Sequence, residues 1–433
     1  MSTRCIVFTA LKPPVENISF SSEMSEENNQ KEPLVISQAT PVPCRIPGLA
    51  DVVGFGPSGV EILRNTFAPQ KELVLPAFGQ DPSAGGWSIA RHVRLVADTT
   101  GSGRADVVGF GEDGVFISVN KGENGFALPR FVNKDFSYES GWRVESSIRF
   151  MADITGDGRA DIVGFGNEGV YISLNQGNSV FGPKILALDD FGVKQGWTLD
   201  KTLRFLADVN GNGLLDIVGF GEAHVSVAFN NGDGTFQKAR PALRGLCFNQ
   251  GYKINDNPRF LADVTGDGKV DIVAFGPDGV YVALNRGDGI FHDPKRVIQN
   301  FSPIEGWTPN KHIRTVADIT GNGIADIVGF GQSNVFMAIN KGDGTFEGVK
   351  PVLAQFTVSQ GWEVGLHPRA LVDITGDGRA DIFGFGAKGI WVSINNGKGG
   401  FNPAVEVYPD FGSNNPGWST TKAVKFLANL YAH

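Results

Sequence analysis

The chain has 433 residues, a formal net charge of −8 and only 3 cysteines. A negative chain without a basic run argues against a nucleic-acid partner, and no apolar stretch of the sequence is long enough to insert into a membrane. Three scattered cysteines cannot supply a disulfide framework, which favours a reduced compartment. The 58 glycines, 32 phenylalanines and 4 methionines are typical of a turn-rich β protein with an aromatic core.

The first 33 residues differ in character from the rest. An apolar patch near the N-terminus is too short for a convincing secretory signal, so we expect a cytoplasmic protein or one secreted by another route. The polar, acidic segment after it predicts disorder. Residues 34–433 are expected to form a single domain, because one repeat runs almost unbroken through them.

That repeat is a 14-residue phrase such as DITGDGRADIVGFG, which recurs at intervals of 55 residues from Asp98, Asp153, Asp208, Asp263, Asp318 and Asp373. The copy from Arg149 predicts four short strands, RFMAD, DIVGFG, GVYISLN and KILALDD, each bounded by turn residues. Four strands in about 55 residues is the size of a β-propeller blade.

The two chain ends complement each other. The N-terminal end has the back half of a unit, from Asp51, without its front half, and the C-terminal end has a front half, from Val424, without its back half. We therefore expect an all-β fold, a seven-bladed β-propeller of four-stranded blades whose ring is closed by the N- and C-terminal strands.

The Asp-rich start of each phrase predicts calcium. Oxygen side chains at positions 1, 3, 5 and 9, with glycines at 4 and 6, resemble a shortened calcium loop. The alternative is a hairpin turn whose carboxylates accept backbone N–H groups without metal. The candidate ligands are Asp153, Asp157, Asp161, Asp208, Asn210, Asn212, Asp216, Asp263, Asp267, Asp271, Asp318, Asn322, Asp326, Asp373, Asp377 and Asp381. In the first copy Ser102 replaces the central acid, which should weaken binding.

Strand alternation places a second set of residues at the opposite end of the ring. A Gly-Trp pair precedes each first strand in most copies, followed by a variable position and, two residues later, a basic residue; an aromatic residue begins most third strands. Such a mixture between blades suits a small polar ligand with apolar faces. The candidates are His92, His312, His367, Arg94, Arg314, Arg369, Trp87, Trp307, Trp362, Tyr171, Tyr281 and Trp391.

Each of these columns also has a structural explanation. The tryptophans could pack between blades, and the arginines could neutralise nearby aspartates. The histidines are the sharper clue, because Ser147, Thr202, Asn257 and Ala423 take the same place in other copies. A packing role would not usually tolerate those replacements.

The phrases ISQATPVP, GWxxxxHxR, DxTGDGxxDIVGFG and NxGDGTF resemble the fungal β-propeller lectins typified by the Psathyrella velutina lectin. The resemblance implies a non-enzymatic, multivalent lectin that binds glycans and glycoproteins ending in N-acetylglucosamine or sialic acid between blades, with Ca²⁺ in the inner loops. It implies that the sugar contacts a tyrosine, here Tyr171 or Tyr281, and one of the three histidines. Glu61 and Ser226 depart from the aromatic pattern, which predicts fewer strong pockets.

Two other classes stay open on the sequence. The Asp loops alone also resemble the FG-GAP repeats of integrin α-subunits, which would make the chain a protein-binding adhesion module. Some propellers are glycan-processing enzymes that use paired carboxylates. No acidic pair is confined to one blade here, so we expect no catalytic residues.

Overall fold

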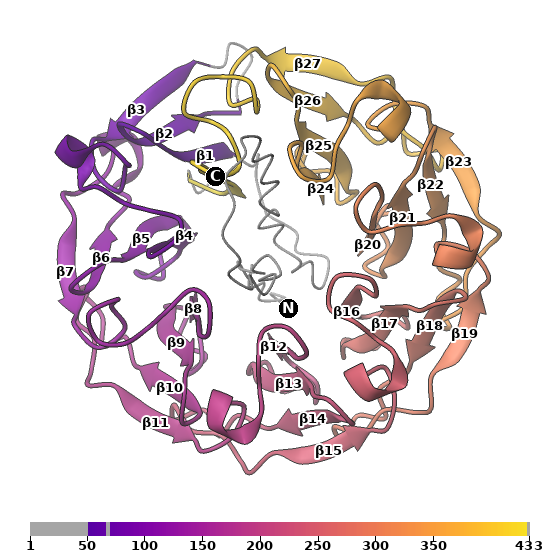
Figure 1. The fold of residues 1–433 in the computed structure, drawn as a ribbon, viewed down its shortest axis with the longest axis horizontal. Coiled ribbons are helices and arrows are strands. Elements are labelled where there is room, and N and C mark those ends of the chain that lie inside the picture. Colours follow the sequence, from indigo (N-terminus) through magenta and orange to yellow (C-terminus); the bar gives the residue numbers. More distant parts are fainter. Residues whose placement is uncertain (1–50, 66–69, 431–433) are drawn as a thin grey trace, which may run out of the picture.

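The protein is a closed ring of seven four-stranded antiparallel sheets in the computed structural model, which describes residues 51–65 and 70–430 (Figure 1). The predicted seven-bladed propeller is confirmed. The described residues contain no α-helix, and no helix there is long and apolar enough to cross a membrane. The expectation about residues 1–33 falls outside the described part of the chain.

We number the blades I to VII from the first complete one. Blade I contains β4 (Val93–Ala97), β5 (Asp106–Phe110), β6 (Val115–Ser118) and β7 (Arg130–Asn133); blade II contains β8 (Ile148–Ala152), β9 (Asp161–Phe165), β10 (Val170–Ser173) and β11 (Ile185–Leu188). Blade III contains β12 (Leu203–Ala207), β13 (Asp216–Phe220), β14 (Val225–Ala228) and β15 (Arg240–Leu243); blade IV contains β16 (Arg259–Ala262), β17 (Asp271–Phe275), β18 (Val280–Ala283) and β19 (Lys295–Ile298). Blade V contains β20 (Ile313–Ala317), β21 (Asp326–Phe330), β22 (Val335–Ala338) and β23 (Lys350–Leu353); blade VI contains β24 (Arg369–Val372), β25 (Asp381–Phe385), β26 (Ile390–Ser393) and β27 (Val405–Tyr408).

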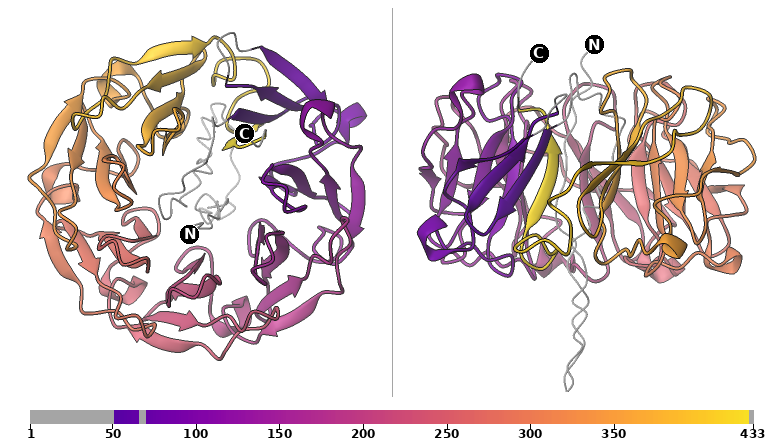
Figure 2. Two further views of the ribbon diagram at one scale, coloured as in Figure 1. Left: turned by 180° about the vertical axis from the view of Figure 1, so that it is seen from behind. Right: turned by 90° about the horizontal axis from the view of Figure 1, so that it is seen from above.

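Blade VII joins the two ends of the described chain. It consists of β28 (Val424–Ala428), β1 (Asp51–Gly56), β2 (Gly59–Leu63) and β3 (Lys71–Leu75). Strand β28 lies innermost and pairs antiparallel with β1, with Asp51 opposite Ala428 and Phe55 opposite Val424. Figure 2 shows β28 in yellow beside the indigo β1. This pairing confirms the ring closure predicted from the half-repeats.

Short 3-10 helices lie in six of the connections: η1 (Pro82–Ala84), η2 (Gly122–Asn124), η3 (Val193–Gln195), η4 (Phe248–Gln250), η5 (Pro303–Glu305) and η6 (Val358–Gln360). All but η2 stand just before a blade's Gly-Trp or Gly-Tyr pair. Each of these five ends on a glycine in the left-handed region, as at Gly196 with φ 87°. Glycine is the residue that accepts this conformation at little cost, so it turns the chain into the next blade.

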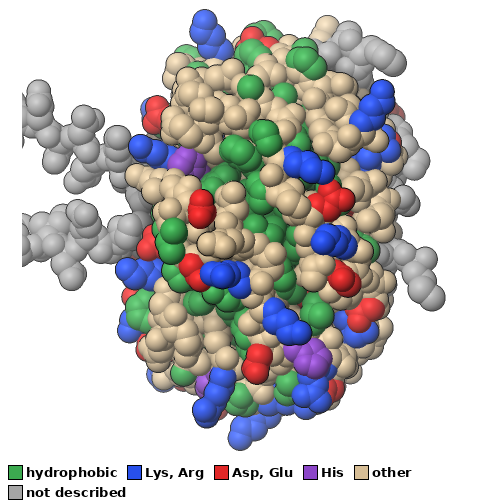
Figure 3. All heavy atoms as spheres, turned by 90° about the vertical axis from the view of Figure 1, so that its right-hand side faces the viewer, with side chains coloured by type: hydrophobic (Ala, Val, Ile, Leu, Met, Phe, Trp, Pro, Cys, Tyr) green, Lys and Arg blue, Asp and Glu red, His purple; other side chains and the backbone are tan. Residues whose placement is uncertain are grey.

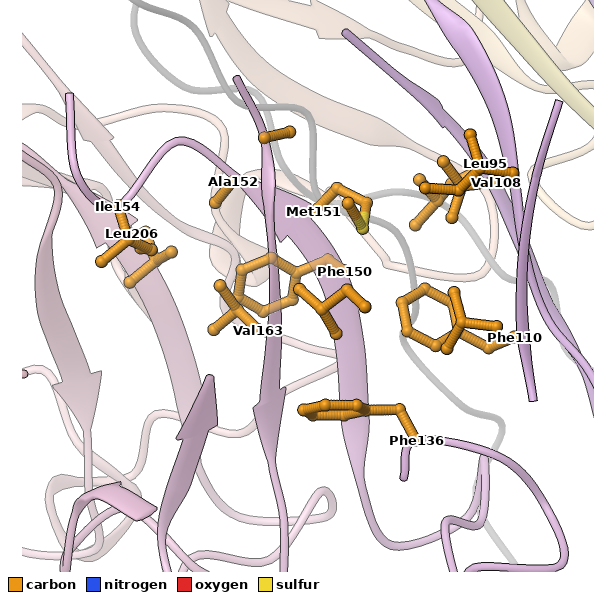
Figure 4. Packing of buried hydrophobic residues seen from close by; sticks show 14 of the residues in the cluster. Leu95, Val108, Phe110, Phe136, Phe150, Met151, Ala152, Ile154, Val163 and Leu206 are labelled. Carbon is orange, nitrogen blue, oxygen red and sulfur yellow. The ribbon is translucent and has the colours of Figure 1, made fainter. Parts of the chain in front are cut away.

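The second strand of every blade is buried along its whole length, because neighbouring blades cover both faces. Between blades I and II, Phe110, Phe136 and Phe150 lie together with at most 1% exposure (Figure 4). Continuous burial explains the weak polar alternation of these strands. On the flank of the ring in Figure 3, basic and acidic side chains are interspersed around hydrophobic ones.

A glycine in the middle of six of the seven second strands makes room for the tryptophan that precedes the first strand. A Cβ on Gly219 would lie 2.4 Å from Trp197 and 2.5 Å from Phe191. Blade IV has Ala274 at this position, and there the two large rings are replaced by the smaller Tyr252 and Leu246. The Gly-Phe-Gly phrase is therefore a packing motif, and its one departure is compensated by two smaller neighbours.

An Asp–Asn pair connects every blade to the one before it. In blade II, Asp161 accepts hydrogen bonds from the backbone N–H of Ile154 and Asn175, and Asn175 donates from its side chain to the carbonyl of Thr99 in the preceding blade. The same cross-blade bond is made by Asn120, Asn230, Asn285, Asn340, Asn395 and, in blade VII, Asn65. Seven such links run round the described ring, each worth about 1 kcal/mol net.

Candidate functional site

The predicted site residues lie where the first strands begin and the second strands turn into the third. Arg94 pairs with Gly109 and Gly109 with Phe116, so the basic, glycine and aromatic columns form one row across a blade. The Asp loops connect the other ends of the first and second strands. The expected separation of the two sets of residues to opposite ends of the ring follows from this register.

All three histidines accept a hydrogen bond from the backbone N–H four residues earlier. The acceptor is Nδ1, and the donors are Ser88, Thr308 and Glu363, at 3.0 to 3.1 Å. Because Nδ1 is an acceptor, the proton of the neutral ring lies on Nε2, which becomes a donor.

Three of the four replacements in the same slot also bond the backbone four residues earlier, whereas Ala423 has no polar side chain. Ser147 Oγ accepts from the N–H of Arg143, and Asn257 Oδ1 accepts from the N–H of Lys253. Thr202 uses its hydroxyl to donate to the carbonyl of Thr198. The slot therefore has a local structural role that small polar residues share, so variability there is weaker evidence for ligand binding than the sequence suggested.

The three Nε2 atoms differ in what they contact. In blade I, His92 Nε2 lies 3.1 Å from the carboxylate of Glu112, which also forms an ion pair with Arg91. In blade VI, His367 Nε2 lies 3.1 Å from the hydroxyl of Ser413.

Nε2 of His312 has no hydrogen-bond partner among the described residues. The residue that corresponds to Ser413 in this blade is the apolar Val358, whose N–H bonds to Gly331 as that of Ser413 bonds to Gly386. Burial lowers the pKa of His312, and the charges of Arg314, Lys311 and Arg369 lower it further. The ring is thus neutral near pH 7 and presents one free N–H donor.

Aromatic rings stand beside each histidine. Trp307 meets His312 edge-on with centroids 5.3 Å apart and Phe336 at 5.9 Å. Trp87 lies 5.2 Å from His92, and Trp362 lies 5.7 Å from His367. These tryptophans fill the space above the second-strand glycines, so packing is a role they have whether or not a ligand binds.

The third-strand aromatics Tyr171, Tyr281 and Trp391 are half-buried and reach the outer part of the same row. Tyr171 packs edge-on against Trp142, and the Tyr281 hydroxyl donates to Asp278, which is also paired with Arg296. Of the three, only Trp391 shares a blade with one of the candidate histidines His92, His312 and His367. The predicted tyrosine–histidine pair would therefore have to come from two different blades.

The arginine column is internal. Arg94, Arg314 and Arg369 are 2%, 3% and 8% exposed, and each donates to the carbonyl of a phenylalanine in the segment before its own strand. Those phenylalanines, Phe78, Phe301 and Phe356, hold φ near 60°, a region that costs a bulky residue about 1–3 kcal/mol.

The guanidinium groups also lie over rings of the preceding blade, Arg94 over Phe55 at 5.7 Å, for example. Burial lowers the pKa of Arg94 to about 10, so it stays charged at neutral pH. In this geometry the three arginines donate to backbone carbonyls and form no ion pair with an aspartate among the described residues, and sugar binding by them stays a prediction. The arginines fasten a strained loop and bridge two blades, and a ligand would reach them only if the interface opened.

Blade VII departs from the other interfaces. Glu61 takes the aromatic position, and Lys71 Nζ lies 2.8 Å from Glu61 and 2.6 Å from Asp410 of the segment after blade VI. The same ammonium lies 5.7 Å from the rings of Phe411 and Trp418.

The partners of the histidines were not foreseen from the sequence. Glu112 follows the Gly-Phe-Gly turn of blade I, where blades V and VI have Gln332 and Ala387, and that difference was the only signal. Ser413 comes from the connection to the next blade, 46 residues along the chain. Lys71 stands alone among the fourth strands in being placed against a third-strand acid.

In the Asp loops, the carboxylates accept hydrogen bonds from backbone N–H groups. In the loop from Asp153, both oxygens of Asp153 accept backbone N–H groups, Oδ1 from Gly156 and Oδ2 from Gly158. Asp161 points into the blade and accepts two more. Calcium needs six to eight converging oxygens. Among residues 51–65 and 70–430, no group of three acidic, histidine or cysteine side chains is placed to hold a metal, and calcium bound with the help of Asn or backbone oxygens stays a prediction.

The chain resembles known proteins in sequence and structure. A model of the FG-GAP-like repeat matches residues 263–328. The structure of an Agrocybe aegerita lectin, described as specifically recognising non-reducing terminal N-acetylglucosamine, is 51% identical, covers 90% of this chain and 98% of its own, and has a TM-score of 0.88. No curated protein matches the chain.

Two further structures are much less similar. A Photorhabdus luminescens Tc holotoxin pore is 15% identical over 79% of this chain and 16% of its own, with a TM-score of 0.44. A Streptococcus pneumoniae sialidase is 9% identical over 79% and 67%, with a TM-score of 0.31. Likenesses this low carry no argument, whereas the identity to the Agrocybe aegerita protein spans nearly its whole length. This chain, a seven-bladed β-propeller, therefore belongs to the family of lectins that includes the Agrocybe aegerita protein.

Proposed function

We propose that this protein is a multivalent lectin for glycans that end in non-reducing N-acetylglucosamine, bound between blades at the end of the ring opposite the Asp loops. The observation that carries the proposal is the 51% identity, over 98% of its length, to a lectin described as specific for that sugar. The relationship also favours a binding protein over an enzyme or an integrin-like adhesion module.

The histidine interfaces supply the chemistry that such a ligand needs. A neutral imidazole that accepts through Nδ1 offers Nε2–H to a sugar hydroxyl or acetamido oxygen, and the neighbouring aromatic rings suit the apolar faces of the sugar. One hydrogen bond of this kind is worth about 1 kcal/mol net, so each site alone would be weak. Several sites on one rigid ring can raise avidity by about 10² to 10⁴ on a glycan-covered surface.

The histidine sites are expected to be unequal. Nε2 of His92 and His367 already contacts Glu112 and Ser413, so a sugar must displace or share those partners. His312 has no such competitor among the described residues. We therefore expect the blade V site to be the strongest of the three.

Changing each histidine to asparagine tests this order. Asn257 shows that asparagine keeps the local N–H bond, so His312→Asn should leave the fold intact and remove only the Nε2 donor. Calorimetric titration with N-acetylglucosamine should lose its tightest class of sites in His312→Asn and change less in His92→Asn or His367→Asn. Equal losses from all three would contradict the proposed order, and no loss from any of them would contradict the proposed site.

A glycan array on the wild-type protein tests the sugar itself. Binding confined to terminal N-acetylglucosamine supports the proposal, and binding to N-acetylneuraminic acid would add the second sugar expected from the sequence. Failure to bind any glycan while binding a protein partner would favour the adhesion module. Calcium in the Asp loops is no part of this proposal and stays a separate prediction.

A further inference from the structure

The first carboxylate of each Asp loop is surrounded by backbone donors. In the loop from Asp208, Oδ1 accepts from the N–H groups of Gly211 and Asn212, and Oδ2 accepts from Gly213. The loops from Asp98, Asp153, Asp263, Asp318 and Asp373 repeat this pattern at 2.6 to 2.8 Å for the N–H of position 6. Such a nest of N–H groups partly neutralises the charge of the carboxylate.

The fifth residue of the loop is matched to the seventh. Where position 5 is aspartate, position 7 is basic and pairs with it: Asp157 with Arg159, Asp267 with Lys269 and Asp377 with Arg379. Where position 5 is asparagine, position 7 is apolar: Asn212 with Leu214 and Asn322 with Ile324. The loop with Ser102 and Arg104 is the exception.

Both kinds of position 5 make the same turn. The side-chain oxygen of Asp157 accepts the N–H of Arg159 at 2.8 Å, and that of Asn212 accepts the N–H of Leu214 at 2.9 Å. A negative charge is therefore not needed at this position for the loop to form. It is present only where a cation two residues later balances it.

The seventh side chain also reaches the loop of the preceding blade. An ideal Cβ on Gly101 would lie 3.5 Å from Cγ of Arg159, and one on Gly266 would lie 3.2 Å from Cδ1 of Ile324. Lys269 and Arg379 approach Gly211 and Gly321 in the same way. Backbone bonds run alongside, such as Ala160 N–H to the carbonyl of Asp98 at 2.9 Å.

We infer that the Asp loops are metal-independent clasps between consecutive blades. Backbone N–H groups neutralise the carboxylate at position 1, and the residue at position 7 balances position 5 and packs on the loop of the blade before. In the loops with aspartate at position 5, the basic side chain at position 7 balances the negative charge, which is the role that the sequence prediction gave to calcium.

Paired variants in blade II distinguish a clasp from a calcium site. Arg159→Leu alone leaves Asp157 uncompensated and should lower the melting temperature, whereas Asp157→Asn with Arg159→Leu reproduces Asn212 and Leu214 and should restore most of it. Both results should be the same in EDTA and in calcium at about 1 mM, a concentration above the dissociation constants of sensor-type loops. Lys194→Leu, which breaks an exposed ion pair with Glu168 elsewhere on the ring, is the matched control.

The calcium prediction gives the opposite pattern. Removing the cation of Arg159 would then strengthen metal binding, Asp157→Asn would weaken it, and the differences would appear only when calcium is present. Saturable calcium binding by calorimetry in the wild-type protein, weakened by Asp157→Asn, would overturn the inference. Absence of a calcium-dependent shift together with recovery in the double variant supports it.

Discussion

At the scale of single residues, the buried polar side chains of this lectin are specialised by their hydrogen bonds. Asp216 accepts two backbone N–H groups inside blade III, and burial raises its pKa to about 7. For His312 and His367 the pKa shift has the opposite direction, because burial lowers their pKa values. Residues of both kinds stabilise the ring in their uncharged forms.

The histidines predict a loss of stability in acid. Their folded-state pKa values lie below the ordinary value of about 6.5, so their contribution is present above pH 6.5 and is lost as the pH falls from there through the folded pKa. Protonation also removes the Nδ1 acceptor that Thr308 and Glu363 use. Between about pH 7.5 and 5, the melting temperature of the wild type should fall relative to that of His312→Asn/His367→Asn.

The comparison between wild type and variant isolates the histidines. Buried aspartates such as Asp216 act in the opposite direction, since a raised pKa gives stability that is lost as the pH rises, but they are common to both proteins. Parallel pH profiles for the two proteins would show that the pKa values of these histidines do not differ between the folded and unfolded states.

At the scale of elements, the fit between the second strand and the segment before the first decides how a blade packs. Gly219 is backed by Trp197 and Phe191, whereas Ala274 is backed by Tyr252 and Leu246. The backbone at the centre of a sheet cannot move aside. The side chains that pack on it therefore have to be smaller where the strand residue is larger.

Gly219→Ala should therefore destabilise blade III by about 1–3 kcal/mol, the usual cost of overpacking. Adding Trp197→Tyr and Phe191→Leu, the combination found in blade IV, should recover most of that loss in a denaturant titration. Gly348→Ala is the control, because nothing lies within 4 Å of a Cβ placed there. No recovery in the triple variant would mean that Ala274 is accommodated by some other feature of blade IV.

At the scale of the whole molecule, one blade is built from both ends of the described chain. The Asp–Asn link of blade VII is complete, since Asn65 donates from its side chain to the carbonyl of Ile374 and its N–H bonds to Asp51. The ion pair of Lys71 with Asp410 adds a second connection between blades VI and VII.

Deleting residues 424–433 should leave the protein insoluble or much less stable, because the inner edge of β1 loses its hydrogen-bonded partner. Asn65→Ala is the milder test and should cost about 1–3 kcal/mol by leaving the carbonyl of Ile374 unpaired. Asn230→Ala, which removes the corresponding link of blade III, should cost a similar amount. A truncated protein with an unchanged melting temperature would contradict ring closure by β28.

The sequence by itself determined the fold and the closure of this protein. A repeat of 55 residues with two complementary half-units leaves few arrangements other than a ring, because each blade buries its faces only against its neighbours. It also placed His312, Trp307 and the Asp loops at their two ends, since antiparallel strands alternate in direction.

Only the tertiary structure decided what those residues contact. Nε2 of His92 meets Glu112 from a turn of its own blade, Nε2 of His367 meets Ser413 from the connection after its blade, and Nε2 of His312 meets no hydrogen-bond partner among the described residues, a difference that only the packed structure reveals. The burial of Arg94 follows from the packing of blade against blade. The hydrogen bonds from backbone N–H groups to both carboxylate oxygens of Asp153 follow from the conformation of its loop. A repeat pattern specifies which groups recur. Which of their hydrogen-bond donors and acceptors stay unpaired depends on neighbouring residues, and these differ from one interface to the next.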